Sequence, residues 1–247
     1  MMDAERFEAL CREDCETLRI LGKESGIGTY KEKRLHRILK RYVTENEAAY
    51  EIPVGRYVAD ICEGGRVTEI QTRAFGRLLP KLRYYLEQTD LSVTVVCPVI
   101  RNKLLIRVDP ETGEILRRKM SPSHKDASDL LPCLFGIREV FPSERLKIRL
   151  LIIDAEEYRY SERVRYRKTG AYESELFPVT LVSDEEFSSA EELRRFLPES
   201  KESFSAAEYG NFIKKKGRDL YSCLNLLCSV GLLDRRKVGK KYIYSVK

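Results

Sequence analysis

The segment from Tyr57 to Phe75 constrains the fold of this chain more than any other stretch. Its sequence, YVADICEGGRVTEIQTRAF, has two short runs rich in Val, Ile, Ala and Thr on either side of a Gly-Gly dipeptide. Such runs suit a pleated, half-buried surface, and the dipeptide suits a tight turn, so the segment predicts two antiparallel strands. Each predicted strand nevertheless carries an acid in its interior, Asp60 in the first and Glu69 in the second.

The turn between these strands decides how the two acids lie. A two-residue turn at Gly64-Gly65 places Asp60 directly opposite Glu69, on one face of the strand pair. Like charges in this position destabilise a sheet by about 0.2–1 kcal/mol, and by more where the dielectric is low. A divalent cation removes the repulsion, because hard cations take carboxylate oxygens as ligands. The spacing alone leaves two interpretations open: a metal site, or acids that face solvent on a one-sided sheet.

The flanking sequence predicts an α/β (α+β) fold class. Apolar periodicity predicts amphipathic helices, and Pro80 either kinks the third of them or marks its start. These helices span residues 2–21, 29–43 and 74–88. In the second helix, Glu32 lies on the apolar side and is expected to point inward. Strands are predicted over residues 50–53, 56–62, 66–73 and 91–100, followed by a hairpin over 103–119. The later sequence predicts a short helix at 130–141, strands at 146–153 and 178–182, and a helical segment at 188–198.

This order of elements, with an inward Glu, a strand Asp and E-x-Q on the next strand, resembles the core of the PD-(D/E)XK nuclease superfamily. The resemblance covers about residues 28–100 and implies a restriction-endonuclease-like mixed sheet flanked by helices. It implies that Asp60 and Glu69 bind Mg²⁺ or Mn²⁺ and that Glu32 is the helix acid. The sequence departs from the superfamily where Ala59 replaces a frequent Pro and Gln71 replaces the usual Lys. The chain is also similar to an uncharacterised bacterial domain family, which implies no activity.

The replacement of Lys by Gln bears on the implied chemistry. In the superfamily the metal ion polarises a phosphoryl oxygen and lowers the pKa of an attacking water. Gln71 can hydrogen-bond to water but carries no charge. Arg73, two residues further along the strand, or Lys81 on the following helix could supply the missing positive charge. The resemblance thus implies a catalytic set made of Asp60, Glu69, Gln71, Glu32 and Arg73.

The C-terminal segment holds the whole excess of positive charge. Of the 45 basic and 39 acidic residues, 11 and 5 lie between Glu199 and Lys247, so the remainder carries 34 of each. A basic terminal module most often marks an anionic partner, nucleic acid first. The segment contains a capping box at Ser205 and Glu208, a KKKG turn, a helix over 218–230 and a hairpin with Gly239 at its tip.

This pattern resembles a winged helix-turn-helix, which implies DNA binding through the second helix and the wing. The residues expected to contact nucleic acid are Lys214, Lys215, Lys216, Arg218, Ser222, Asn225, Arg235, Arg236, Lys237, Lys240 and Lys241. Winged helices also serve as protein-binding and dimerisation modules, so an interaction adaptor is an open alternative.

Composition narrows the remaining classes. The two histidines and seven cysteines show no zinc-ligand spacing, and the cysteines are expected to be reduced thiols. No apolar run approaches the roughly 18–20 residues that a membrane span needs, and no secretory signal is visible, so a cytoplasmic protein without a membrane partner is expected. The sequence leaves the choice between a monomer and a homodimer open.

Together these features predict three domains: a nuclease-like domain over residues 1–145, a linking β-rich region over 146–198 and a winged helix over 199–247. The expected function is a metal-dependent nuclease that acts on DNA. The alternatives are a non-catalytic DNA-binding or regulatory protein with a degenerate nuclease core, or the interaction adaptor.

Overall fold

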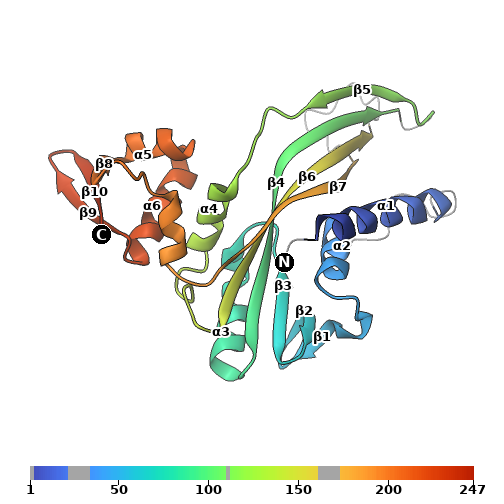
Figure 1. Cartoon of the computed structure of the whole chain (residues 1–247), viewed down its shortest axis with the longest axis horizontal. Coiled ribbons are helices and arrows are strands. Elements are labelled where there is room, and N and C mark those ends of the chain that lie inside the picture. The colour runs from blue at the N-terminus through green and yellow to red at the C-terminus, as the bar shows by residue number, and fades with distance from the viewer. Residues whose placement is uncertain (1–2, 22–33, 110–111, 161–172) are drawn as a thin grey trace. The chain divides into compact units, whose positions relative to one another are not determined.

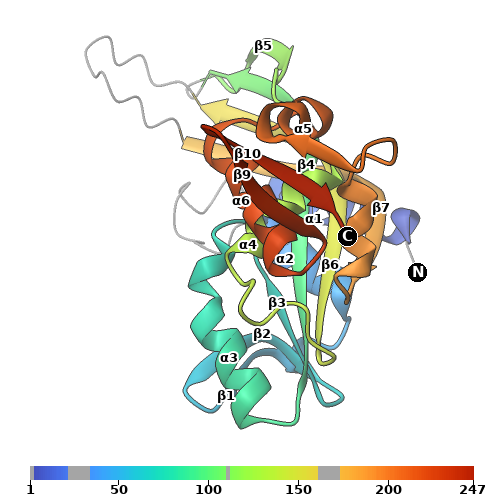
Figure 2. The same ribbon diagram turned by 90° about the vertical axis from the view of Figure 1, so that its left-hand side faces the viewer.

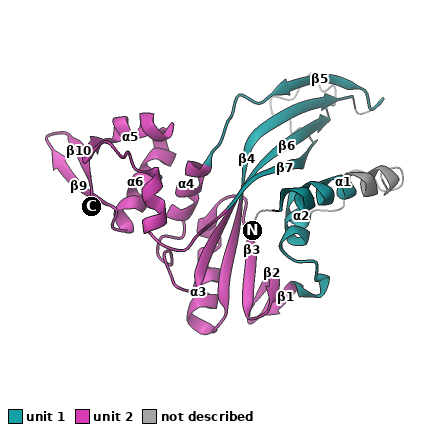
Figure 3. Ribbon diagram, viewed as in Figure 1, with its two compact units in different colours: residues 1–50, 98–126, 151–184 teal, residues 51–97, 127–150, 185–247 magenta. Residues whose placement is uncertain are grey.

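The computed structural model describes residues 3–21, 34–109, 112–160 and 173–247 (Figure 1). It has a mixed α+β fold with a large mixed sheet flanked by helices, which confirms the predicted α+β class. The strand order in this sheet is β1-β2-β3-β4-β6-β7, and β5 pairs with β4. Contacts divide the chain into two compact units, each drawn from three segments (Figure 3). The first contains residues 1–50, 98–126 and 151–184, and the second contains 51–97, 127–150 and 185–247.

The second unit begins with the strand pair that the Gly-Gly turn predicts. Its first elements are β1 (Tyr50–Val54), β2 (Tyr57–Glu63), β3 (Arg66–Ile70), a 3₁₀ helix (Phe75–Arg77), α3 (Leu79–Gln88) and β4 (Ser92–Val108). Strands β2 and β3 are antiparallel, with Cys62 opposite Val67 and Glu63 opposite Arg66. Both turn glycines have positive φ, 56° and 75°, as a two-residue primed turn requires. The predicted register is therefore confirmed.

Helix α3 connects β3 to β4, which run parallel to each other. Pro80 lies in the first turn, where a missing N–H costs nothing, so it marks the start of the helix and does not kink it. Leu82 and Tyr85 are fully buried. Hydrogen bonds from α3 to Glu69, described below, hold this helix over β3 (Figure 2).

The first unit is built from two helices and from parts of three long strands and β5. The helices are α1 (Ala4–Leu21) and α2 (Arg34–Val43), a 3₁₀ helix covers Glu47–Ala49, and the strands are β5 (Ile115–Met120), β6 (Leu146–Tyr160) and β7 (Glu173–Phe187). Asp14 of α1 is buried and forms ion pairs with Arg34 and Arg37 of α2 at 3.2 and 2.5 Å. These pairs fasten α1 to α2.

The C-terminal part of the second unit has its own three-stranded sheet, ordered β8-β10-β9. Its elements are a 3₁₀ helix (Glu191–Phe196), β8 (Ser203–Ser205), α5 (Ala206–Ile213), α6 (Gly217–Ser229), β9 (Leu233–Val238) and β10 (Lys241–Val246). The capping box is present: Ser205 Oγ accepts from the Glu208 backbone N–H, and Glu208 accepts from the Ser205 N–H. Helix α6 packs against α4 (Leu130–Phe135) through buried leucines.

Several elements differ in length from the sequence-based expectation. Strand β3 ends at Ile70 and not at Arg73, because the chain turns into a 3₁₀ helix after Ala74, whose φ is 53°. The two apolar runs over 91–100 and 103–108 form one continuous strand, β4. Strands β6 and β7 are longer than predicted, and the expected helix at 188–198 is a 3₁₀ helix over Glu191–Phe196.

Two further observations concern cysteines and hydropathy. The six cysteines whose side chains are described are free thiols. Over the described part of the chain, every helix is too short or too polar to cross a membrane.

Candidate functional site

The structure brings Asp60 and Glu69 together on neighbouring strands. The β2–β3 pairs end with Ile61 opposite Thr68, and Asp60 and Glu69 are the next residues of the two strands, so side-chain alternation puts both on one face. The Asp60 carboxylate accepts a hydrogen bond from the backbone N–H of Ile70 at 2.7 Å, which fixes it beside β3. Glu69 is only 2% exposed. Glu69 is therefore not a solvent-exposed acid on a one-sided sheet.

The protonation of Glu69 is finely balanced. Burial, and after it the negative charge of Asp60, raise the pKa of its carboxyl group, which lies at about 7. Two groups of α3 act against this rise: Lys81 Nζ lies 2.6 Å from Glu69 Oε2, and the Tyr85 hydroxyl donates to Oε1 at 3.2 Å. Glu69 can consequently gain or lose a proton near neutral pH.

Helix spacing explains why Lys81 and Tyr85 reach the same carboxylate. Residues four apart lie on one face of an α-helix, so both side chains point from α3 toward β3. Burial and the charge of Glu69 raise the pKa of Tyr85, which keeps its hydroxyl protonated as a donor. Lys81 is the residue, of the two expected to supply a positive charge, that contacts Glu69. Tyr85 was not among the site residues expected from the sequence, and its four-residue spacing from Lys81 was the available signal.

The other residues of the expected catalytic set lie elsewhere. Gln71 follows the last residue of β3, and its side-chain amide donates to the backbone carbonyl of Arg73. The Gln71 backbone N–H continues the sheet by donating to Val96 O at 2.9 Å. Arg73 is exposed in the turn that leads to the 3₁₀ helix. Glu32 lies outside the described residues.

The donor set determines what ion these residues could hold. Asp60 and Glu69 offer carboxylate oxygens, which Mg²⁺ and Mn²⁺ prefer, and Mg²⁺ usually keeps several waters beside one or two protein carboxylates. Across the described ranges no group of three or more His, Cys, Asp or Glu residues converges on one point. A cation would share the Glu69 oxygens with Lys81 and Tyr85. Asp60 and Glu69 therefore fit a weakly bound ion that keeps several water ligands better than an ion enclosed by protein ligands.

The basic residues of the C-terminal segment are mostly exposed. They include Lys214 and Lys216 in the α5–α6 turn, Arg218 on α6, and Arg235, Arg236, Lys237, Lys240 and Lys241 on the hairpin. Ser222 and Asn225 are half-buried on α6. Lys215 differs from its neighbours: its side chain is 12% exposed and lies 2.8 Å from Asp129, just before α4. Lys215 therefore anchors the turn to α4, while the flanking lysines face solvent.

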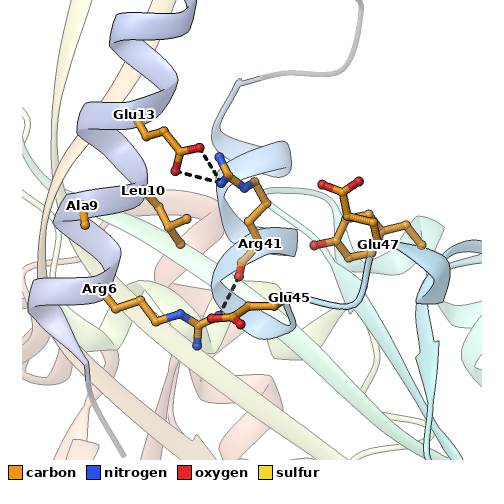
Figure 4. Close-up of a pocket in the computed structure, with 8 residues that line it drawn as sticks. Arg6, Ala9, Leu10, Glu13, Arg41, Glu45 and Glu47 are labelled. Atoms are coloured by element: carbon orange, nitrogen blue, oxygen red, sulfur yellow. Dashed lines mark hydrogen bonds and ion pairs between the residues drawn. The ribbon is translucent and has the colours of Figure 1, made fainter.

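One open pocket of about 300 Å³ lies in the first unit, between α1, the end of α2 and Tyr50. Figure 4 shows the charged side chains that line it. Arg41 binds the two oxygens of Glu13 at 2.8 and 2.9 Å, and Arg6 lies 3.4 Å from Glu45. These contacts satisfy the arginines within the pocket, which carries no arrangement of reactive groups.

The sequence comparisons place the chain in a family. Residues 33–188, more than half of the chain, match the family described as "Domain of unknown function (DUF8091)", and the chain belongs to it. An "Uncharacterized protein" of Treponema pallidum (strain Nichols) is 30% identical over 181 residues, which cover 70% of each chain. No solved structure matches. The matched family residues include Asp60, Glu69 and Lys81 but not the C-terminal segment.

Proposed function

We propose that this DUF8091 member hydrolyses phosphodiester bonds of DNA with a divalent metal ion. The observation that carries the proposal is the buried Glu69, which faces Asp60 and is held by Lys81 at 2.6 Å. Perturbed, buried ionisable groups that converge from separate elements are typical of functional sites. A buried glutamate beside a half-buried aspartate has no evident structural benefit, because like charges so placed destabilise the sheet.

The residues would divide the chemistry as follows. Asp60 and Glu69 would hold Mg²⁺ or Mn²⁺, which when bound polarises a phosphoryl oxygen and lowers the pKa of an attacking water. Lys81 would supply the positive charge that Gln71 cannot, stabilising negative charge that develops on the phosphate. Tyr85 would orient Glu69 through its hydroxyl donor. Metal binding requires Glu69 to be ionised, so it should strengthen as the pH rises through about 7.

The arrangement of elements supports a PD-(D/E)XK-like core within this proposal. The order α2-β1-β2-β3-α3-β4 is the one that the resemblance implies, and the two acids lie on adjacent strands. The positive charge comes from α3 in place of the strand position occupied by Gln71. Such a relocation keeps the charge near Glu69 while it changes the sequence motif.

The C-terminal segment supports the second half of the proposal, a winged helix that delivers DNA to the core. Two helices followed by an antiparallel hairpin, with exposed basic residues on the turn, the second helix and the hairpin, suit phosphate contacts. The packing of α6 on α4 and the Lys215–Asp129 pair tie this module to the rest of its unit. DNA held by α6 would thus be held by a firmly packed module.

A specific observation favours a second candidate, a non-catalytic DNA-binding protein with a lapsed core. Both carboxylate oxygens of Glu69 have hydrogen-bond partners, and Gln71 bonds to its own loop. In this alternative Lys81 replaces the metal ion as the group that neutralises the acids.

Cleavage assays in Mn²⁺ with duplex, single-stranded and branched DNA distinguish the two candidates. Asp60→Asn and Glu69→Gln should each abolish cleavage and the thermal stabilisation of the protein by Mn²⁺, because each removes a metal-binding charge while keeping its shape. Glu63→Gln is the matched control: this carboxylate is exposed on the same strand as Asp60, and its loss should leave both readouts unchanged. If the wild type cuts none of the substrates and gains no stability from Mg²⁺ or Mn²⁺, the catalytic proposal is wrong and the non-catalytic candidate takes its place.

A further inference from the structure

Aromatic side chains interrupt the basic surface of the C-terminal segment. Tyr221 on α6 is 54% exposed and Tyr242 on β10 is 47% exposed, although both are large enough to be core residues. Tyr221 lies near the middle of α6, and Asn225 follows it by one helical turn on the same face. The face of α6 that is expected to meet nucleic acid is therefore partly aromatic.

Contacts join this helix face to the hairpin. The Arg235 guanidinium lies 4.9 Å from the centre of the Tyr242 ring, a cation–π distance. The same guanidinium donates to Asn225 Oδ1 at 3.4 Å. Arg235 thus bridges Asn225 of α6 and Tyr242 of β10, so Tyr221, Asn225, Arg235 and Tyr242 form one surface, here called the aromatic platform.

The chemistry of this platform favours bases that are not paired. Within a duplex, base faces are stacked on one another and only their edges are accessible, so an exposed tyrosine ring gains little from them. An unpaired base can stack on an aromatic ring, and an arginine beside the ring adds a cationic contact. Phosphates of the same strand would meet the exposed Lys237, Lys240 and Lys241 of the hairpin.

The charge around the platform argues for nucleic acid over a protein partner. The hairpin carries five basic residues and a single acid, Asp234, which lies 2.9 Å from Lys247. Protein interfaces also use Tyr and Arg, but their centres are depleted in lysine. Aromatic rings interleaved with lysines are the arrangement that tracks a single strand.

We propose that the aromatic platform binds the unpaired bases of single-stranded or partly single-stranded nucleic acid by stacking on Tyr221 and Tyr242. This inference rests on the proposed function of the segment as a nucleic-acid-binding module, and it specifies the form of the substrate. It assigns Tyr221 and Tyr242 to the binding surface, in addition to the basic and polar residues expected from the sequence.

The test is a fluorescence-anisotropy titration of the full chain in EDTA, so that cleavage does not contribute. The probes are a labelled blunt duplex, the same duplex with a single-stranded extension, and the extension alone, each over a series of salt concentrations. The wild type should bind the extended duplex more tightly than the blunt one. Tyr221→Leu and Tyr242→Leu should each reduce binding of the extended probe by roughly tenfold, the scale of one lost base–aromatic stack, and should leave blunt-duplex binding nearly unchanged.

Two control variants separate stacking from bulk and from folding. Tyr221→Phe keeps the aromatic face and should retain the preference for unpaired bases. Phe212→Leu removes a comparably exposed ring, 50% exposed, which lies on α5 beside the Tyr209 ring and is not part of the platform, so it should change nothing. All three side chains are about half exposed, and unchanged melting temperatures should confirm that the four variants fold.

The outcomes are distinguishable. Equal binding of blunt and extended duplexes, unaffected by Tyr221→Leu and Tyr242→Leu, would overturn the stacking proposal while the nucleic-acid-binding module stands. Failure of the wild type to bind any probe at low salt would overturn the module itself, and the platform with it.

Discussion

The β2–β3 site and the C-terminal segment each contain a glutamate whose pKa is shifted, and the two shifts have opposite directions. At the site, Glu69 is buried with Asp60 beside it, and the pKa of Glu69 rises to about 7. In the C-terminal segment, Glu208 is exposed in the capping box, where hydrogen bonds from Lys201 and Ser205 lower its pKa to about 2. Burial thus makes one glutamate responsive to neutral pH, while hydrogen bonding keeps the other ionised throughout the physiological range.

The difference in burial predicts whether pH or salt concentration should affect each region. Buried charges are shielded from salt but respond to protonation, because the surrounding protein cannot replace the water they have lost. Exposed basic side chains keep their charge at any moderate pH and interact with an anionic partner in a salt-dependent way. The site should accordingly be a pH-dependent region, and the C-terminal segment a salt-dependent one.

Removing the cation that pairs with the buried Glu69 should give the largest effect on stability. Lys81→Met leaves Glu69 buried with no ionised partner, so at pH 8 the free energy of unfolding should fall by about 3–5 kcal/mol. Below about pH 6 the loss should be much smaller, because Glu69 is then protonated in the folded protein. Urea denaturation at the two pH values measures both quantities.

The matched control for this variant is Lys147→Met. Lys147 also pairs with a glutamate, Glu186 at 3.0 Å, but both side chains are about half exposed. Such pairs contribute about 0–1 kcal/mol, so this variant should unfold almost like the wild type at both pH values. Equal losses for the two lysines would contradict the buried character of the Lys81–Glu69 pair.

The titration of Glu69 itself should give the next largest effect. Between pH 4.5 and about 7 the folded protein holds a proton on Glu69 that the unfolded chain has released, so stability falls as the pH rises. The rise of the carboxyl pKa from 4.5 to about 7 corresponds to a loss of up to about 3 kcal/mol, complete above pH 7. Glu69→Gln should remove this loss, which chemical denaturation over a pH series measures.

Glu208, the exposed glutamate of the C-terminal segment, serves as a control because its contribution to stability depends on pH with the opposite sign. Because its folded pKa is lowered, Glu208 contributes stability above pH 4.5 that is lost as the pH falls through about 2. Glu208→Gln should leave the trend between pH 4.5 and 7 intact. If this variant flattens that trend as Glu69→Gln does, the trend does not originate at the site.

A smaller and purely salt-dependent effect is expected from the hairpin lysines. Lys240→Gln combined with Lys241→Gln should make the log–log salt dependence of DNA binding shallower by roughly 2, since each phosphate contact contributes about 0.9. The melting temperature should not change, because both side chains are exposed. Anisotropy titrations over a salt series give the slope.

Lys215→Gln is the control for the loss of a lysine that is already in an ion pair. Lys215 carries the same charge and lies in the same segment, but it pairs with Asp129. Its loss should lower the stability of the α6–α4 contact and leave the salt slope nearly unchanged. If Lys215→Gln changes the slope as much as the hairpin variant does, Lys215 contacts DNA despite its ion pair with Asp129.

The local features of this protein followed from its sequence because each depends on residues close together in the chain. The Gly64-Gly65 turn set the β2–β3 register and put Asp60 and Glu69 on one face of the strand pair. The Ser205 and Glu208 spacing predicted the capping box, and the hairpin beyond α6 formed where Gly239 predicted its tip. Turn geometry and helix periodicity act over a few residues, so the pattern alone specifies them.

The tertiary structure decided which distant side chains meet. Only the packing of α3 over β3 brings Lys81 and Tyr85 to Glu69, and the early end of β3 turns Gln71 toward its own loop. Likewise, only the packing of α6 on α4 assigns Lys215 to Asp129 while Lys214 and Lys216 stay exposed. Periodicity tells which face of a helix a residue occupies, but the partner on that face depends on how separate elements pack. The sequence thus determined where the charges lie along the chain, and the packing determined which of them are neutralised.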